Sequence, residues 1–133
     1  MIQYFKYMTN AAFKNLKGKW HLRIKHDETE TVASIARHMR NHNCTFSEST
    51  IKAVLEDFTN CMVEQLLEGK NVKIENLGTF NITAKSVGAD SPEELTASNL
   101  KDFQLNVRGI GKLSKKELKD SVKLQEVPTY KKP

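Results

Sequence analysis

The sequence predicts an α+β domain with two N-terminal helices, an antiparallel β-sheet and a short C-terminal helix. Apolar residues recur with a helical period between residues 32 and 66, and with a period of two beyond Gly69. Residues 68–82, EGKNVKIENLGTFNI, join the two patterns, because a helix stops there and a hairpin begins. A length of 133 residues fits one domain with short extensions.

Residues 1–26 are expected to form a β extension. In KGKWHLRIK, residues 17–25, apolar and basic side chains alternate, which is typical of a half-buried strand. The apolar face would hold Trp20, Leu22 and Ile24, and the basic face Lys19, His21, Arg23 and Lys25. Two interpretations of the basic face stay open: protection of an exposed sheet edge, or contact with phosphates.

Two amphipathic helices should follow. The first is expected to start near Asp27 or Thr29 and to end at residues 41–43, and the second to open with a capping box from Thr45 to Glu48. Their apolar stripes are Val32, Ile35, Ala36 and Met39, and Ile51, Val54, Leu55, Phe58, Met62 and Leu66. The second stripe is too long for the partners that one chain offers. We therefore expect a homodimer, in which this helix packs against a second copy.

Gly69 is expected to end the second helix, because glycine adopts the left-handed cap conformation without steric cost. Two strands should follow on either side of a turn at residues 77–79, with their apolar residues on one face. These residues are Val72, Ile74, Phe80 and Ile82.

Beyond this hairpin, residues 84–102 are polar and rich in turn-forming residues, which indicates an exposed arm or a long loop. Residues 103–107 return to strand alternation, and residues 109–111 interrupt it. A capping box from Ser114 to Glu117 opens the last helix. The predicted division is a β extension at 1–26, a main domain at 27–124 and a flexible tail at 125–133.

Charge is distributed unevenly along the chain. Residues 1–26 carry six basic side chains and no acidic one, and residues 109–133 carry seven lysines against three acidic residues. The residues between them are net acidic. Basic ends on an acidic middle indicate a polyanionic partner such as a nucleic acid.

The chain has no feature of a membrane or secreted protein. No apolar run approaches the roughly 18 residues that would span a bilayer, and the start lacks a signal-peptide pattern. Two cysteines, Cys44 and Cys61, do not make a disulfide framework. A cytoplasmic protein with reduced thiols is expected.

We find no pattern of an enzyme and expect no cofactor or small-molecule substrate. Residues 109–112, GIGK, lack the spacing and the following Ser or Thr of a phosphate-binding P-loop. His38, His42 and Cys44 have a spacing that a zinc site could use, but histidines also favour a helix C-terminus. We expect no metal site.

The order of elements, with GKNVKIENLGTFNI at its centre, resembles the HU/IHF family of bacterial histone-like DNA-binding proteins over residues 28 to about 120. The most specific part is Gly-x-x-Val-x-Ile-x-x-Leu-Gly-x-Phe, from Gly69 to Phe80. The strands before the first helix resemble an HU-related branch with an N-terminal extension. The resemblance implies an IHF-like fold, an intertwined dimer whose projecting β-arms reach around the DNA minor groove.

The expected arm departs from the family pattern. A proline near each arm tip in the family wedges between base steps, and Pro92 stands near that place. Asp90, Glu93 and Glu94 surround it, however, and carboxylates repel phosphates. Pro92 is therefore read either as a wedge or as an ordinary turn proline. Gly111 and Lys112 match the family's Gly-Lys after the last strand.

The expected function is that of a histone-like, nucleoid-associated protein, which binds double-stranded DNA with low sequence specificity through phosphate contacts and condenses it; the sequence leaves open whether the DNA is also bent. The alternative is a structural or protein-interaction dimer that kept the fold and lost strong DNA binding. The candidate DNA-binding residues are Lys17, Lys19, Arg23, Lys85, Pro92, Lys101, Arg108, Lys112, Lys115 and Lys116.

Overall fold

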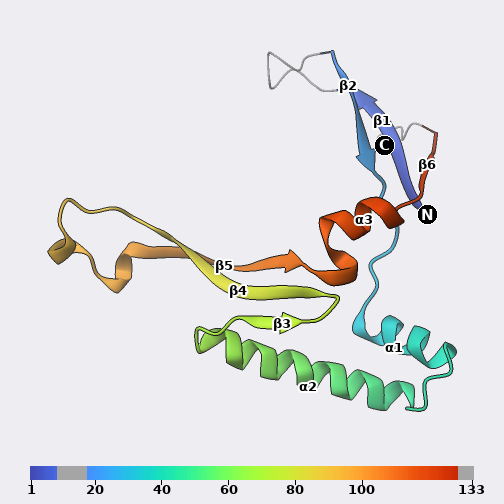
Figure 1. Cartoon of the computed structure of the whole chain (residues 1–133), viewed down its shortest axis with the longest axis horizontal. Helices are drawn as coiled ribbons and strands as arrows, with labels where there is room; N and C mark the ends of the chain where they lie inside the picture. Colours follow the sequence, from blue (N-terminus) through green and yellow to red (C-terminus); the bar gives the residue numbers. More distant parts are fainter. Residues whose placement is uncertain (9–17, 129–133) are drawn as a thin grey trace. The chain divides into compact units, whose positions relative to one another are not determined.

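The computed structural model of the chain describes residues 1–8 and 18–128 (Figure 1). The fold is α+β, as predicted, and divides into two compact units, Met1–Thr29 with Lys119–Pro133, and Glu30–Leu118. This division differs from the predicted one, because residues 124–126 pair with the N-terminal residues 2–4. Lys17, a candidate DNA-binding residue, lies outside the described residues.

The first unit contains a three-stranded sheet of β1 (Ile2–Met8), β2 (Trp20–Ile24) and β6 (Leu124–Glu126), in the order β2-β1-β6. β2 lies within residues 17–25, for which the alternation predicted a strand; β1 pairs antiparallel with β2 and parallel with β6. The expectation of a flexible tail from residue 125 is wrong where β6 extends into it. An ion pair from Lys6 to Glu126 (3.0 Å) and a hydrogen bond from the Val127 amide to the Tyr4 carbonyl (2.9 Å) hold β6 against β1.

The second unit begins with α1 (Val32–Asn41) and α2 (Glu48–Leu67), both of which start later than the sequence predicted. Thr31 caps α1, because its hydroxyl accepts from the Ser34 amide while the Ser34 hydroxyl accepts from the Thr31 amide. The predicted Thr45–Glu48 capping box is also wrong. Ser47 caps α2 by accepting from the Thr50 amide at 3.2 Å.

α2 ends where predicted, since Gly69 takes a φ of 82° and its amide donates to the Leu66 carbonyl. The following turn lies at residues 75–77, between β3 (Val72–Ile74) and β4 (Gly78–Ser86), and not at residues 77–79. Asn76 supplies the left-handed conformation there, with a φ of 61°. Gly78 is a buried residue of β4, where a Cβ would lie 3.0 Å from the Arg108 carbonyl oxygen.

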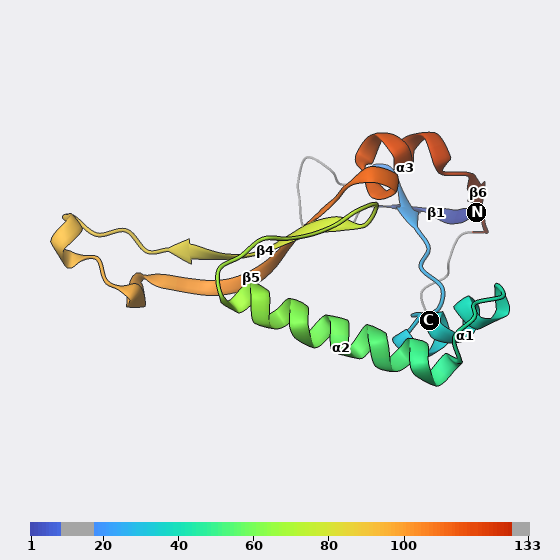
Figure 2. The ribbon, with the colours of Figure 1, turned by 60° about the horizontal axis from the view of Figure 1, so that its bottom comes forward.

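β4 forms the middle of a second sheet, between β3 and β5 (Leu100–Gly109). β5 begins earlier than the predicted strand at 103–107, so residues 84–86 and 100–102 of the expected arm or loop belong to the paired strands, whereas residues 87–99 lie beyond them. Figures 1 and 2 show this hairpin continuing past the end of α2. Its end, residues 87–99, contains two 3-10 turns, Pro92–Glu94 and Ala97–Asn99, and is closed by the Asn99 side chain, which donates to the Val87 carbonyl.

After β5 come a 3-10 turn, Gly111–Leu113, and α3 (Lys115–Ser121). The Ser114 hydroxyl accepts from the Glu117 amide at 3.3 Å, which is one half of the predicted capping box. No helix among the described residues is long and apolar enough to cross a membrane.

The core is small. Ala36, Ile51 and Leu66 are the buried apolar residues of the described chain. Large apolar side chains of α2 and β5 remain in solvent, among them Val54 (60% exposed) and Phe103 (67%). A domain of this size ordinarily buries well over half of its surface on folding, so these faces lack a cover within one chain.

Candidate nucleic-acid interface

One face of the β4–β5 hairpin is a ladder of polar side chains. Three successive cross-strand pairs alternate with the apolar pairs Phe80–Val107 and Ile82–Leu105, so they share the opposite face of the sheet. These pairs are Thr79–Arg108, Asn81–Asn106 and Thr83–Gln104. The alternation separates an apolar face toward α2 from a face that offers hydrogen-bond donors and acceptors.

A β-bulge extends this polar face toward the end of the hairpin. The register shifts between Thr83 and Lys85, and Asp102 takes a φ of 55° within the irregularity. Between the pairs Thr83–Gln104 and Lys85–Lys101, β5 therefore has one residue more than β4. As a result Lys101 lies on the same face of the sheet as Gln104, although the two are three residues apart. The bulge places Lys101 opposite Lys85.

Lys85 and Lys101 are thus like charges that face each other across the ladder. Such a pair is unfavourable in the absence of a counter-charge. Neither lysine forms an ion pair within the described part of the chain. An anion between the two ammonium groups would relieve their repulsion.

At the other end of the ladder, Arg108 lines two hollows. One, of about 520 Å³, is lined by Asn106, Ser114 and Lys115 among others, and one of about 480 Å³ includes Thr79, Asn81 and Asn106. The Asn81 side-chain oxygen is buried and has no hydrogen-bond partner. Both hollows are open and combine a guanidinium group with amide and hydroxyl side chains, which suits an extended anionic ligand.

Lys112 is positioned by the turn between β3 and β4. Its amide donates to the Asn76 side-chain oxygen at 3.4 Å. Gly111, with a φ of 57°, lies so close to Asn76 that a Cβ on it would collide with that side chain. The β3–β4 turn thereby fixes the position of Gly111 and Lys112.

The remaining candidate residues occupy separate places. Lys115 and Lys116 begin α3, Lys19 precedes β2 and Arg23 lies within it. Pro92 opens the first 3-10 turn at the hairpin end and is exposed. The structure brings Arg108 and Lys115 to one hollow and pairs Lys85 with Lys101, whereas Lys19 and Arg23 belong to the other unit.

The ion pairs separate the cations of the described chain into two groups. Lys6, Lys25, Arg37, Lys52 and Lys70 each contact a carboxylate. The second group forms no such pair; it holds the described candidates Lys19, Arg23, Lys85, Lys101, Arg108, Lys112, Lys115 and Lys116, together with Arg40, Lys73, Lys119 and Lys123. Their charge is therefore available to an external anion.

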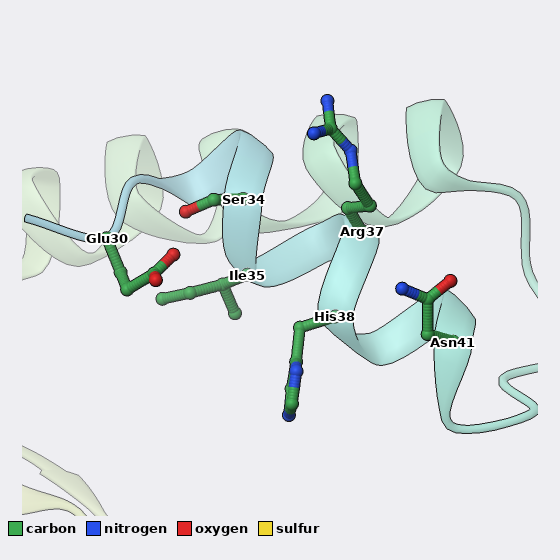
Figure 3. A pocket seen from close by; sticks show the side chains of 6 residues that line it. All are labelled: Glu30, Ser34, Ile35, Arg37, His38 and Asn41. Atoms are coloured by element: carbon green, nitrogen blue, oxygen red, sulfur yellow. The ribbon is translucent and has the colours of Figure 1, made fainter. Parts of the chain in front are cut away.

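A hollow on α1 carries residue types that enzymes use, but not in a catalytic arrangement. Glu30, Ser34 and His38 line it with Ile35, Arg37 and Asn41 (Figure 3). The Ser34 hydroxyl donates to the Thr31 carbonyl at 3.0 Å as part of the helix cap. In Figure 3 the Ser34 side chain and the His38 ring point in different directions, so His38 does not address this hydroxyl as a base.

The histidines considered for zinc contact each other. The rings of His38 and His42 lie edge to face, with centroids 4.5 Å apart. No group of three or more potential metal ligands occurs in the part of the chain that the structure describes. Cys44 and Cys61 are free thiols.

The polar ladder was missed from the sequence. Its signal is present, since Thr79, Asn81 and Thr83 alternate with apolar residues, as do Gln104, Asn106 and Arg108. Only the pairing of β4 with β5 shows that the two polar sets share one face.

Comparison with known proteins gives the family. The sequence model of the HU-HIG family matches residues 1–126. This family is described as an HU domain fused to a wHTH, Ig or glycine-rich motif. No curated protein matches the chain.

A crystal structure from Bacteroides vulgatus ATCC 8482, described as that of a candidate bacterial DNA-binding protein, shares the fold with a TM-score of 0.68 and 11% identity. The match covers 97% of this chain and 49% of that one, so the chain spans about half the length of its structural relative. The chain belongs to the HU-HIG family of HU domains, as the family match over residues 1–126 shows.

Proposed function

We propose that the protein binds double-stranded DNA with low sequence specificity, through contacts with phosphates. The observation that carries the proposal is the pair of like charges Lys85 and Lys101, which face each other across the hairpin and form no ion pair within the described residues. The family match supports it, because the matched model is an HU domain. The description of the Bacteroides vulgatus relative as a candidate DNA-binding protein supports the proposal too.

The strands of the hairpin and the segment after it form the phosphate-binding surface. Lys85 and Lys101 hold one phosphate between them, and Arg108, Lys112 and Lys115 contact the backbone further along. Each neutralised phosphate releases counterions, so affinity falls steeply with salt. Lys116 adds a contact from α3.

The hairpin end contributes less than the strands. Pro92 stands at the first position of a 3-10 turn, where proline is favoured for its fixed φ alone. Glu93 and Glu94 follow it, and both are exposed. Their charge opposes the approach of a phosphate, so DNA bending by a Pro92 wedge is the weaker part of this function.

The binding form is a homodimer. A groove of about 400 Å³ between α2 and the hairpin is lined by apolar residues, including Met62, Leu67, Ile82 and Phe103. Exposed Val54 and Phe58 of α2 supply matching apolar side chains from a second copy. Burial of this surface between two copies supplies apolar burial that the small core of one chain lacks.

A titration of fluorescent duplex DNA with the protein, followed by anisotropy at several salt concentrations, tests the proposal. We expect binding at low salt, a log–log slope of several units, and a solution mass of twice the chain mass by light scattering. Absence of binding at low salt would contradict the DNA-binding function. A monomeric mass would contradict the homodimer.

A second candidate function is a structural or protein-interaction dimer, which the acidic hairpin end favours. Charge reversal separates the two. Lys112→Glu combined with Lys115→Glu and Lys116→Glu should abolish duplex binding if this surface contacts phosphates. Unchanged affinity would show that the surface does not bind DNA, and a wild-type dimer without DNA affinity would favour the structural role.

A further inference from the structure

The sheet of the first unit carries a second surface, which the duplex-binding proposal does not use. On one face of β1 and β2, Tyr7 lies directly opposite His21, and Phe5 opposite Arg23. The Tyr7 and His21 rings have centroids 5.9 Å apart, and those of Phe5 and Tyr7 are 6.5 Å apart. Aromatic rings therefore continue across two strands of this sheet face.

A guanidinium group covers part of this aromatic surface. The Arg23 carbon Cζ lies 4.8 Å from the centroid of the Tyr7 ring, which is a cation–π contact. Arg23 is exposed and has no acidic partner among the described residues. The ring holds the planar cation in place, so it presents both a positive charge and a flat face to solvent.

Other groups of the same face complete the surface. Lys19 and Lys25 share the alternation of His21 and Arg23 on either side of them. Lys25 is engaged by Asp27 at 3.1 Å and by the Gln3 side chain at 3.3 Å, whereas Lys19 forms no ion pair within residues 1–8 and 18–128. The surface thus has one free ammonium group at the start of β2 and a free guanidinium at its middle.

Edge protection alone does not account for this arrangement. β2 is an edge strand, and lysine or arginine on it would discourage pairing with another chain. That role needs charge but no aromatic ring beneath the charge. The Nε2 atom of His21 is buried and has no hydrogen-bond partner. The contact of the His21 ring with Tyr7 is therefore a ring contact and does not involve a hydrogen bond of that nitrogen.

We propose that this surface, formed by Tyr7, His21 and Arg23 with Lys19, binds single-stranded nucleic acid. An unpaired base stacks on the Arg23 guanidinium and the adjoining ring of Tyr7, and Lys19 contacts the phosphate next to it. Stacking requires the flat face of a base, which a duplex does not offer within its helix. The surface therefore selects unpaired strands, irrespective of their sequence.

The site is distinct from the proposed duplex-binding surface. Its residues all belong to the first unit, whereas Lys85, Lys101, Arg108 and Lys112 belong to the second. Loss of one activity can therefore be distinguished from loss of the other in the full chain.

The test uses anisotropy titrations of the full chain with a fluorescent oligothymidylate, an oligouridylate of equal length, and a blunt duplex without single-stranded ends. Tyr7→Leu and Arg23→Gln should each weaken binding of the single strands about tenfold, because one stacked base is lost. Duplex affinity should change less than threefold. Tyr7→Phe, which keeps the ring, should retain the affinity of the wild type.

Tyr4→Leu is the matched control, because Tyr4 lies on the same strand but faces the other side of the sheet, opposite Ile24. It should leave single-strand binding unchanged. Equal losses for Tyr4→Leu and Tyr7→Leu would overturn the proposal, and so would absence of single-strand binding by the wild type. Binding of only one of the two oligomers supports the site and identifies DNA or RNA as its ligand.

The variant with Lys112, Lys115 and Lys116 changed to Glu separates this site from the duplex-binding surface. It should lose duplex binding and keep single-strand binding. If it loses both, the single strand binds to the second unit and the proposed site is wrong. If wild type binds single strands but no duplex, the function proposed above fails and this site stands.

Discussion

The amide of Lys112 donates a hydrogen bond to the side chain of Asn76, with 3.4 Å between the nitrogen and Oδ1. The two residues are 36 positions apart, so this contact ties the segment after β5 to the turn between β3 and β4. Asn76 also provides the left-handed conformation of that turn. One residue, Asn76, therefore shapes the β3–β4 turn and positions a lysine that is proposed to contact DNA.

Gly111→Ala should destabilise the fold, because its Cβ would collide with Asn76 and its φ of 57° is unfavourable for alanine. Strain of this kind costs about 2 kcal/mol or more. Urea unfolding measures the change. Gly88→Ala is the control, since nothing lies within 4 Å of its Cβ and its φ is not in the left-handed region; we expect less than about 0.5 kcal/mol there. Equal effects at both glycines would show that the contact with Asn76 is unimportant.

Lys101→Gln should weaken duplex binding and reduce the log–log salt slope by about one, because one phosphate contact is lost. The same change should stabilise the free hairpin slightly, since it removes a like charge opposite Lys85. Anisotropy titrations at four or more salt concentrations give the slope. Lys52→Gln serves as the comparison, because Lys52 lies on α2 and pairs with Glu56; a slope change as large as that of Lys101→Gln would contradict a specific role for Lys101.

Asp102→Val should destabilise the protein by about 1–2 kcal/mol, because a β-branched residue tolerates a φ of 55° poorly. Asp102→Gly should be tolerated, since glycine adopts this conformation freely. Thermal or urea unfolding of both variants checks the expectation. The bulge interpretation fails if valine and glycine give the same stability.

Glu126→Gln should lower the pKa of Lys6. The hydrogen bond and the charge of Glu126 raise the pKa of Lys6 above its ordinary value. A raised lysine pKa means that the pair stabilises the fold below the unfolded pKa of about 10.4 and that this contribution is lost as pH rises through the folded pKa. An NMR titration of the Lys6 side chain in both proteins measures the difference. An identical pKa in the two proteins would show that the ion pair does not persist in solution.

Regular elements of the fold followed from local patterns. The helix stop at Gly69 and the strand alternation of residues 20–24 depend on neighbours in sequence, and both were predicted correctly. Helix starts were misplaced because several residues near each start can cap, and the choice of Thr31 and Ser47 depends on backbone geometry. The β3–β4 turn was misplaced because Gly78 was read as a turn residue, whereas Asn76 takes the left-handed conformation.

Candidate cations were easier to find than the surface they form. Lysine and arginine are visible in any sequence, but their ion pairs are not. Lys25 and Lys19 have the same place in the alternation, yet only Lys25 is neutralised by a carboxylate. The strand β6 was missed for a similar reason, since three residues acquire strand structure only through pairing with β1.

The sequence by itself determined the α+β class, the family and the uneven charge, because these depend on periodicity, on a local motif and on composition. The tertiary structure decided which charges remain free and which faces they share. The bulge at Asp102 is the clearest case: one left-handed residue turns Lys101 to the polar face opposite Lys85. Register is a relation between two strands, so no pattern within either strand could specify it.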